Sequence, residues 1–234
     1  MAKNHGPRQQ KRMAKQKARR SAKRSILLRH SSNDPTIRLQ RAEKWPVVQA
    51  LAGARLWDEG IGYLTIARQE SEGRLIFAVF LVDVYCLGVK DAFWRAGTHR
   101  DLDDLIRQME ERQRMCAITP ACLAKIVKGA VAYAQSFGFA PHPDYRHASM
   151  LLEGIDPSTC PYQFTFGRDG KPFYMQGPYE SLAQATAITQ RVQDAGGHFL
   201  MAIPGGGEGD LSAIEGDFDE LDSLDEDDFP DESP

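Results

Sequence analysis

Carboxylate and lysine side chains follow an apolar segment in a pattern that could support chemistry. In LVDVYCLGVKDAFWR, residues 81–95, Asp83 lies within the apolar run, and Lys90 and Asp91 come shortly after it. A carboxylate on an apolar strand is costly unless it is paired, and such a cluster could hold a metal or activate a nucleophile. Asp83, Lys90 and Asp91 are therefore candidate catalytic residues. The alternative is structural, with Asp83 bonded to backbone amides, Lys90 or Arg95.

A second group of potential ligands lies in GFAPHPDYRHA, residues 138–148. His142, Asp144 and His147 are close together in this segment and are all side chains that bind metals. Their spacing differs from the helical H-E-x-x-H pattern of metalloproteases, and His142 lies between two prolines that could simply orient the loop. The three residues form a candidate metal site, and the spacing specifies no particular metal or cofactor.

A third candidate is the turn in FGRDGKPFYMQGP, residues 166–178. Arg168 and Lys171 flank an Asp-Gly pair, and two basic groups at a hairpin tip could contact phosphate. Turn chemistry alone also explains the aspartate, glycine and proline at these positions. The chain contains neither the phosphate-loop pattern G-x-x-x-x-G-K-[ST] nor a G-x-S-x-G nucleophile elbow.

The N-terminal segment has the strongest charge signal in the chain. Residues 1–30 hold 11 Lys and Arg and no Asp or Glu. Such an arm binds polyanions by releasing counterions, and because it has no aromatic residue it would contact phosphates without sequence preference. RNA or the ribosome is the expected partner; a solubility tail, an import signal and an anionic membrane contact are alternatives. The candidate contacts are Lys11, Arg12, Lys15, Lys17, Arg19, Arg20, Lys23 and Arg24.

The C-terminal segment carries the opposite charge. Residues 208–234 hold 13 Asp and Glu and no Lys or Arg, whereas residues 31–207 have a net charge of −1 from 18 basic and 19 acidic side chains. This acidic tail could bind the basic arm within the same molecule, or it could be a solvated tail with no such role. Both appendages have the composition of segments that are disordered when free.

Cysteine usage and hydropathy bear on the compartment. Four scattered cysteines without C-x-x-C spacing are too few for a disulfide scaffold, so we expect free thiols and a reducing compartment. The sequence has no stretch of about 18 apolar residues, so no membrane span is predicted. The first 25 residues lack the apolar region of a secretory signal. A cytoplasmic location is expected, with an organellar transit peptide as the alternative. The cysteines are Cys86, Cys116, Cys122 and Cys160.

These candidate residues must be positioned by strands and helices that hydrophobic periodicity predicts. Residues 60–68 and 74–88 are rich in β-branched and aromatic residues and predict a hairpin whose second strand is covered on both faces. Residues 38–53 predict a helix, or two short helices because Pro46 interrupts the pattern. Residues 89–95 predict a short helix after the second strand.

The second half predicts two capped helices and a second hairpin. Helices are expected from Thr98 to about Arg114 and from Thr119 to Gly138. Strands 162–166 and 172–176, a helix ending at 196–197 and a strand at 198–203 should follow. The fold class is therefore α+β, with a single core, two β-hairpins and four to five helices. The predicted divisions are a disordered arm at 1–37, a core domain at 38–203 and a disordered tail at 204–234.

Three of these motifs together resemble a family. LVDVYCLGVKDAF, GFAPHPD and FGRDGKPFYMQGP, in this order, are similar to patterns in an uncharacterised family of bacterial cytoplasmic proteins. The resemblance spans about residues 45–203 and excludes both charged appendages. It implies a bacterial cytoplasmic setting and a single core, and it implies no activity, cofactor or site residue.

The leading hypothesis is a nonenzymatic RNA- or ribosome-associated protein that uses its basic arm. One alternative is a metal-dependent nuclease or other phosphoester hydrolase, with Asp83 and Asp91 as first candidates and His142 and Asp144 as second. The other is a protein-interaction module that docks through its acidic tail.

Overall fold

The computed structural model describes residues 35–70, 72–177 and 180–201. Residues 1–41 and residues 42–234 are separate compact units. The described part of the first is the helix α2, Pro35–Arg41. All other elements belong to the second unit.

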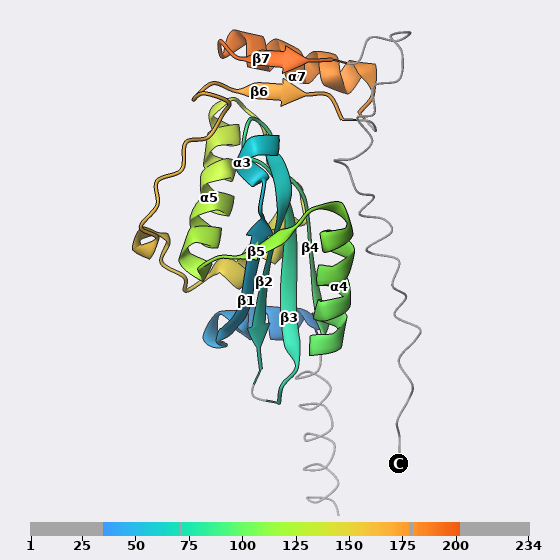
Figure 1. Ribbon diagram of the computed structural model, residues 1–234, viewed down its shortest axis with the longest axis vertical. Coiled ribbons are helices and arrows are strands. Elements are labelled where there is room, and N and C mark those ends of the chain that lie inside the picture. The colour runs from blue at the N-terminus through green and yellow to red at the C-terminus, as the bar shows by residue number, and fades with distance from the viewer. Residues whose placement is uncertain (1–34, 71, 178–179, 202–234) are drawn as a thin grey trace, which may run out of the picture. The chain divides into compact units, whose positions relative to one another are not determined.

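An antiparallel sheet forms the centre of this unit, with strand order β4-β3-β2-β1-β5 (Figure 1). Its two central strands are buried along both faces, as the continuous apolar runs in their sequences require. Antiparallel pairing between neighbours along the chain needs only short turns. The strands are β1 Val47–Gly53, β2 Ile61–Gln69, β3 Leu75–Asp83, β4 Gly88–Gly97 and β5 Met115–Ala117.

Two helices cover opposite faces of the sheet (Figure 1). The helix α4, His99–Arg112, begins at a capping box between Thr98 and Asp101 and packs its apolar stripe on one face. The helix α5, Pro120–Ser136, has Thr119 as its N-cap and a proline in its first turn, where the missing N–H costs nothing. The core between the sheet and α4 includes Tyr63, Phe77 and Val79 from the strands and Leu102, Leu105 and Met109 from the helix.

Shorter elements complete the layer that contains α5. The helix α6, Tyr145–Ala148, continues into the 3₁₀ helix η2, Ser149–Leu152. The ring of Tyr145 packs edge-on against Phe80 of β3, with 6.2 Å between centroids. The remaining short helices are η1 Ala42–Lys44, α3 Leu56–Glu59 and η3 Pro157–Thr159.

The C-terminal described segment forms a small β–α–β unit beyond the β3–β4 turn (Figure 1). Its strands β6, Phe173–Met175, and β7, His198–Leu200, pair in parallel, and α7, Leu182–Asp194, connects them. The amide of Phe173 donates to the carbonyl of Tyr85 at 3.1 Å, so the β–α–β segment is attached directly to the β3–β4 turn.

The α+β class is confirmed, as are the hairpin of β2 and β3 and the helices α4, α5 and α7. The helix expected over residues 38–53 is wrong beyond residue 44, because residues 47–53 form β1. Their apolar positions satisfy a helical spacing, but pairing with β2 and β5 buries them as a strand. Proline 46 ends the preceding helical segment.

Two further expectations are wrong. Residues 89–95 are not a helix but part of β4, which pairs with β3 along its whole length. Residues 162–166 are not a strand, and the expected second hairpin is reduced to a single bridge between Arg168 and Lys171. Within the described ranges, none of the helices has the length and apolar character that crossing a bilayer requires.

Candidate functional site

The β3–β4 turn places Asp83 where its carboxylate organises the backbone. Its Oδ1 accepts the amide N–H groups of Tyr85 and Cys86, each at 2.8 Å. Gly88 closes the turn with φ of +71°, and a Cβ there would lie 2.9 Å from the carbonyl oxygen of Ala130 in α5. The structural alternative for Asp83 therefore matches the observed contacts.

Lys90 reaches from β4 to the segment before α7. Leu81 pairs with Asp91 while Val82 pairs with Val89, so Lys90 is the additional residue of a β-bulge, a device that redirects a side chain. Its Nζ lies 3.2 Å from Oε1 of Glu180, and the two side chains are only 15% and 17% exposed.

Glu180 receives two further hydrogen bonds. The hydroxyl of Tyr174 and the amide of Gly177 both donate to its Oε2, the latter at 3.1 Å. Burial opposes ionisation of Glu180, but the hydrogen bond from Tyr174 and the charge of Lys90 outweigh it, and the pKa lies below its ordinary value. Glu180 is therefore a charged anchor that joins β4 to β6.

The electrostatics of the turn suit proton binding better than nucleophilic attack. Burial raises the pKa of Asp83 to about 6, although Lys90 and the turn amides act in the opposite direction. Burial, together with the charges of Asp83 and Glu180, also raises the pKa of the Cys86 thiol far above its usual value. Cys86 stays a thiol near neutral pH, and the thiolate is the nucleophilic form.

Asp91 points to a different set of partners from Asp83. Its Oδ1 accepts the Ala92 amide at 2.6 Å and lies 3.6 Å from Nδ1 of His142. Oδ2 of Asp144 lies 3.9 Å from the same ring nitrogen. The structure thus brings one first-choice candidate, Asp91, next to two second-choice candidates.

The predicted metal site gains no support from this arrangement. Among the described residues, which include all of 138–148, no group of three or more His, Cys, Asp and Glu side chains is placed to hold a metal ion. His147 turns to the guanidinium of Arg146, 3.4 Å away. The nuclease hypothesis, which needs converging carboxylates, likewise gains nothing from Asp83 and Asp91.

The candidate phosphate contacts of the basic arm, from Lys11 to Arg24, lie outside the described residues, as does the acidic tail. A small hollow of about 280 Å³ adjoins Glu180, and its lining is almost wholly apolar. Phe139, Ile188 and Arg191 contribute to it. The guanidinium of Arg191 donates to the carbonyl of Gly138 at 3.0 Å and so serves the local structure.

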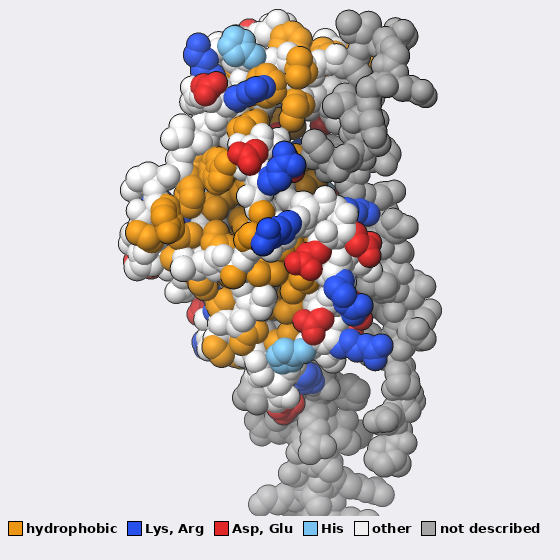
Figure 2. Space-filling view, in the orientation of Figure 1, with side chains coloured by type: hydrophobic (Ala, Val, Ile, Leu, Met, Phe, Trp, Pro, Cys, Tyr) orange, Lys and Arg blue, Asp and Glu red, His pale blue; other side chains and the backbone are white. Residues whose placement is uncertain are grey.

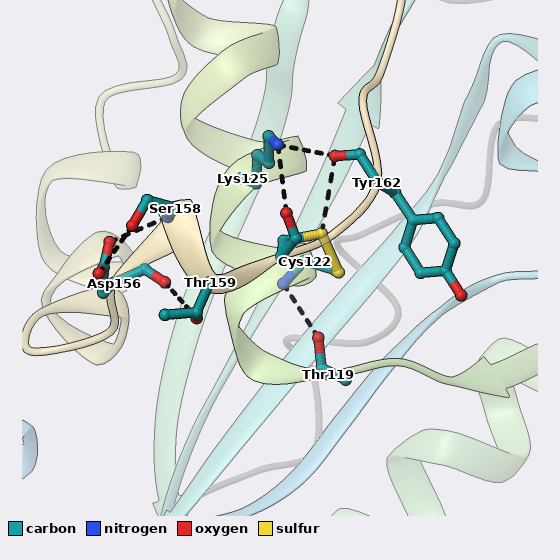
Figure 3. Close-up of a disulfide and its surroundings, with 8 residues drawn as sticks. Thr119, Cys122, Lys125, Asp156, Ser158, Thr159 and Tyr162 are labelled. Atoms are coloured by element: carbon teal, nitrogen blue, oxygen red, sulfur yellow. Dashed lines mark hydrogen bonds between the residues drawn. A yellow bond between two sulfur atoms is a disulfide. The ribbon is translucent and has the colours of Figure 1, made fainter.

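A disulfide is a feature that no local pattern in the sequence reveals. Cys122 near the start of α5 is bonded to Cys160, which follows η3 (Figure 3). The expectation of four free thiols is therefore wrong for these two, while Cys86 and Cys116 are free. Lys125, one turn along α5, donates to the carbonyls of Cys160 at 3.4 Å and Tyr162 at 2.7 Å. We call residues 160–166, which these contacts hold on α5, the aromatic strap.

The strap carries three aromatic residues, and two of them stack on rings of neighbouring helices. Phe164 stacks on Trp57 of α3 at 5.4 Å, and Phe166 stacks on Tyr133 of α5 at 5.9 Å. Tyr162 is 65% exposed. No spacing rule links Trp57 to a segment a hundred positions later, so only the folded chain reveals this cluster.

A second missed residue is Arg68 of β2, whose side chain is almost fully buried. Its guanidinium donates to four backbone carbonyls, at 2.6 to 2.9 Å. Because these carbonyls belong to two separate segments, Arg68 joins them across the sheet face. The four acceptors are Glu43, Trp45, Leu151 and Glu153.

No protein-family model, curated protein or solved structure matches this chain. The resemblance of its three motifs to bacterial cytoplasmic proteins stays a prediction.

Proposed function

We propose that this protein is a nonenzymatic RNA-associated protein that binds phosphates through its basic N-terminal arm, with the ribosome as its principal target. The observation that carries the proposal is the charge of residues 1–30, which hold 11 Lys and Arg and no Asp or Glu. The turn around Asp83 supports it indirectly, since its polar groups are engaged in holding the fold.

Counterion release is the physical basis of the binding. Each phosphate neutralised on a single strand contributes roughly 0.7 log units to the salt dependence of the association constant. An arm with cations and no aromatic ring binds RNA through this term alone and does not distinguish sequences.

The acidic tail belongs to the same proposal. Its 13 carboxylates in residues 208–234 nearly balance the arm's 11 cations, so an intramolecular contact between the two would compete with weakly bound polyanions. Such competition would raise selectivity for dense phosphate surfaces such as ribosomal RNA.

A cytoplasmic location is part of the proposal, because ribosomes are the target. Disulfides are rare in that compartment, so the Cys122–Cys160 bond must resist the thiol pool there. Both cysteines are only 3% exposed, and thiol exchange requires access to a sulfur atom. The proportion of the oxidised form in protein extracted under alkylating conditions checks this part independently.

A mobility-shift assay with a uniform single-stranded RNA tests the proposal. The test variant replaces the eight candidate cations between Lys11 and Arg24 with Gln. A matched control keeps all their charges but shuffles the order of residues 1–30. We expect a large loss of affinity in the first and none in the second. Equal affinity of the neutralised variant and the natural chain would refute the proposal.

A further inference from the structure

The basic arm can neutralise phosphates but cannot contact bases, and the folded unit supplies the missing chemistry. We propose that the aromatic strap, together with Trp57, is a base-stacking surface for single-stranded RNA. This inference rests on the proposed function and adds to it the surface of the core that meets the RNA. Aromatic rings bind single strands without sequence preference, because every base has a π-face.

The strap is held in place before any ligand arrives. The Cys122–Cys160 disulfide fixes its first residue, and Lys125 binds the carbonyl of Tyr162 itself. The preceding turn is fixed by Asp156, whose carboxylate accepts the amide of Ser158 at 2.9 Å. A binding segment that is already ordered loses less entropy when it binds.

Tyr162 is the residue best placed to stack. It is 65% exposed, although its backbone carbonyl accepts a hydrogen bond from Lys125 and Cys160, two residues earlier, is fixed by the disulfide. Its ring extends away from the disulfide and from α5 (Figure 3). An aromatic ring that is left in water on an anchored backbone gains little for the fold, and its free faces are what a base requires.

The rings of Phe164 and Trp57 extend the surface; they are stacked and nearly parallel, with an interplanar angle of 9°. Phe166 fills the base of the strap against Gly129 of α5, where a Cβ would lie 2.6 Å from the ring. Hydrophobic side chains gather over α5 and the strap, with Lys and Arg side chains at the border of this area (Figure 2).

Cations near the strap can reach the phosphates of a stacked strand. Arg55, two residues before Trp57, has a side chain that is 69% exposed, and its guanidinium pairs with Glu59 at 3.1 Å, so a phosphate would compete with that carboxylate. Arg168 and Lys171, the pair at the predicted phosphate-binding turn, are exposed directly after the strap. We favour RNA over a protein as the occupant, because the chain that carries these rings also carries a phosphate-binding arm.

The experiment compares two probes on the full-length protein: a uniform 20-nucleotide single-stranded RNA and inorganic polyphosphate, which has the charge but no bases. We expect Tyr162→Ala to weaken RNA binding about tenfold, as loss of one base stack would, and to leave polyphosphate binding unchanged. Tyr162→Phe keeps the ring and should bind RNA like the natural chain. Because Tyr162 is exposed, thermal unfolding should be the same for all three proteins.

Trp57 provides a second measurement. RNA should quench tryptophan fluorescence in the natural chain, and less so in Trp57→Phe, which leaves Trp45 and Trp94 as reporters. If Tyr162→Ala binds RNA as tightly as the natural chain while both still bind polyphosphate, the stacking surface is refuted and the arm's role stands. If the natural chain binds neither probe, the proposed function fails as well. A Tyr162→Ala variant that keeps its RNA affinity but loses a protein partner would also overturn the inference.

Discussion

The Nζ atom of Lys90 lies 3.2 Å from the Oε1 atom of Glu180, and this pair joins the edge strand of the sheet to the segment before α7. Both side chains are mostly buried, and Glu180 also accepts hydrogen bonds from Tyr174 and Gly177. The cluster that the sequence suggested as catalytic therefore lies where two parts of the fold meet.

Removing one partner of this pair should destabilise the protein more than removing both. Glu180→Met leaves the Lys90 charge without this carboxylate in a poorly hydrated place, so we expect a loss of about 2 kcal/mol in the free energy of unfolding. The double variant Lys90→Met, Glu180→Met should lose less than the sum of the single variants Lys90→Met and Glu180→Met. Urea denaturation of the four proteins measures the coupling, and strict additivity would contradict the interaction.

Asp83 should make stability depend on pH in an unusual direction. Burial raises its pKa from 3.8 to about 6, so between these values the folded state holds a proton that the unfolded state has lost. The free energy of unfolding contributed by this group should fall as pH rises from about 4 to about 6, by up to about 3 kcal/mol.

Asp83→Asn tests this prediction because an amide oxygen can still accept the two turn amides. The stability of the natural chain relative to the variant should rise by up to about 3 kcal/mol as the pH falls from about 6 to about 4. Glu180 has a lowered pKa, so its stabilising contribution is lost only as the pH falls below about 4.5. A difference that is constant from pH 4 to pH 7 would contradict the assignment.

The elements with strong local signals were predictable from the sequence. β2 and β3 are continuous apolar runs, and α4 and α5 begin at side-chain caps that a sequence can display. The apolar spacing of β1 fits both the helix and the strand period, and only pairing with β2 decides between them. β4 is an edge strand, and its polar and charged residues interrupt the apolar pattern by which a strand is recognised in a sequence.

The sequence indicates which residues belong to the candidate site better than it indicates which residues they contact. Hydrogen bonds from turn amides to Asp83 are one of the structures that the sequence allows, because the amide donors lie within four residues of Asp83. The partner of Lys90 is ninety residues away in the chain, and the disulfide spans a separation of 38. No local pattern encodes such contacts, since they depend on how the elements pack.

The disulfide should contribute substantially to stability. Closing a loop of this length limits the unfolded chain, which corresponds to about 3 to 4 kcal/mol in the entropic description. The free energy of unfolding of the double variant Cys122→Ser, Cys160→Ser, measured by guanidinium denaturation, should be lower by that amount, and a reductant should then have no further effect. Cys116→Ser, which removes an exposed free thiol, is the control. Equal stability of the double variant and the control would show that the bond does not form.

Arg68 should tolerate no substitution by lysine. The four carbonyls that it binds are spread around a planar guanidinium, and a single ammonium group cannot reach them all. We expect Arg68→Lys to lower the free energy of unfolding by about 3 kcal/mol. Arg107→Lys on the surface of α4, where the ion pair with Asp104 is exposed, should change it by less than about 0.5 kcal/mol.

The salt dependence of RNA binding tests the central claim most directly. The association constant of the full chain for a uniform single-stranded RNA is measured from low to moderate NaCl, alongside the variant in which the eight arm cations are replaced by Gln. The account predicts a steep log–log slope for the natural chain, reduced in the variant by about 0.7 for each cation that contacts a phosphate. The same slope in both proteins would show that the arm does not bind the RNA.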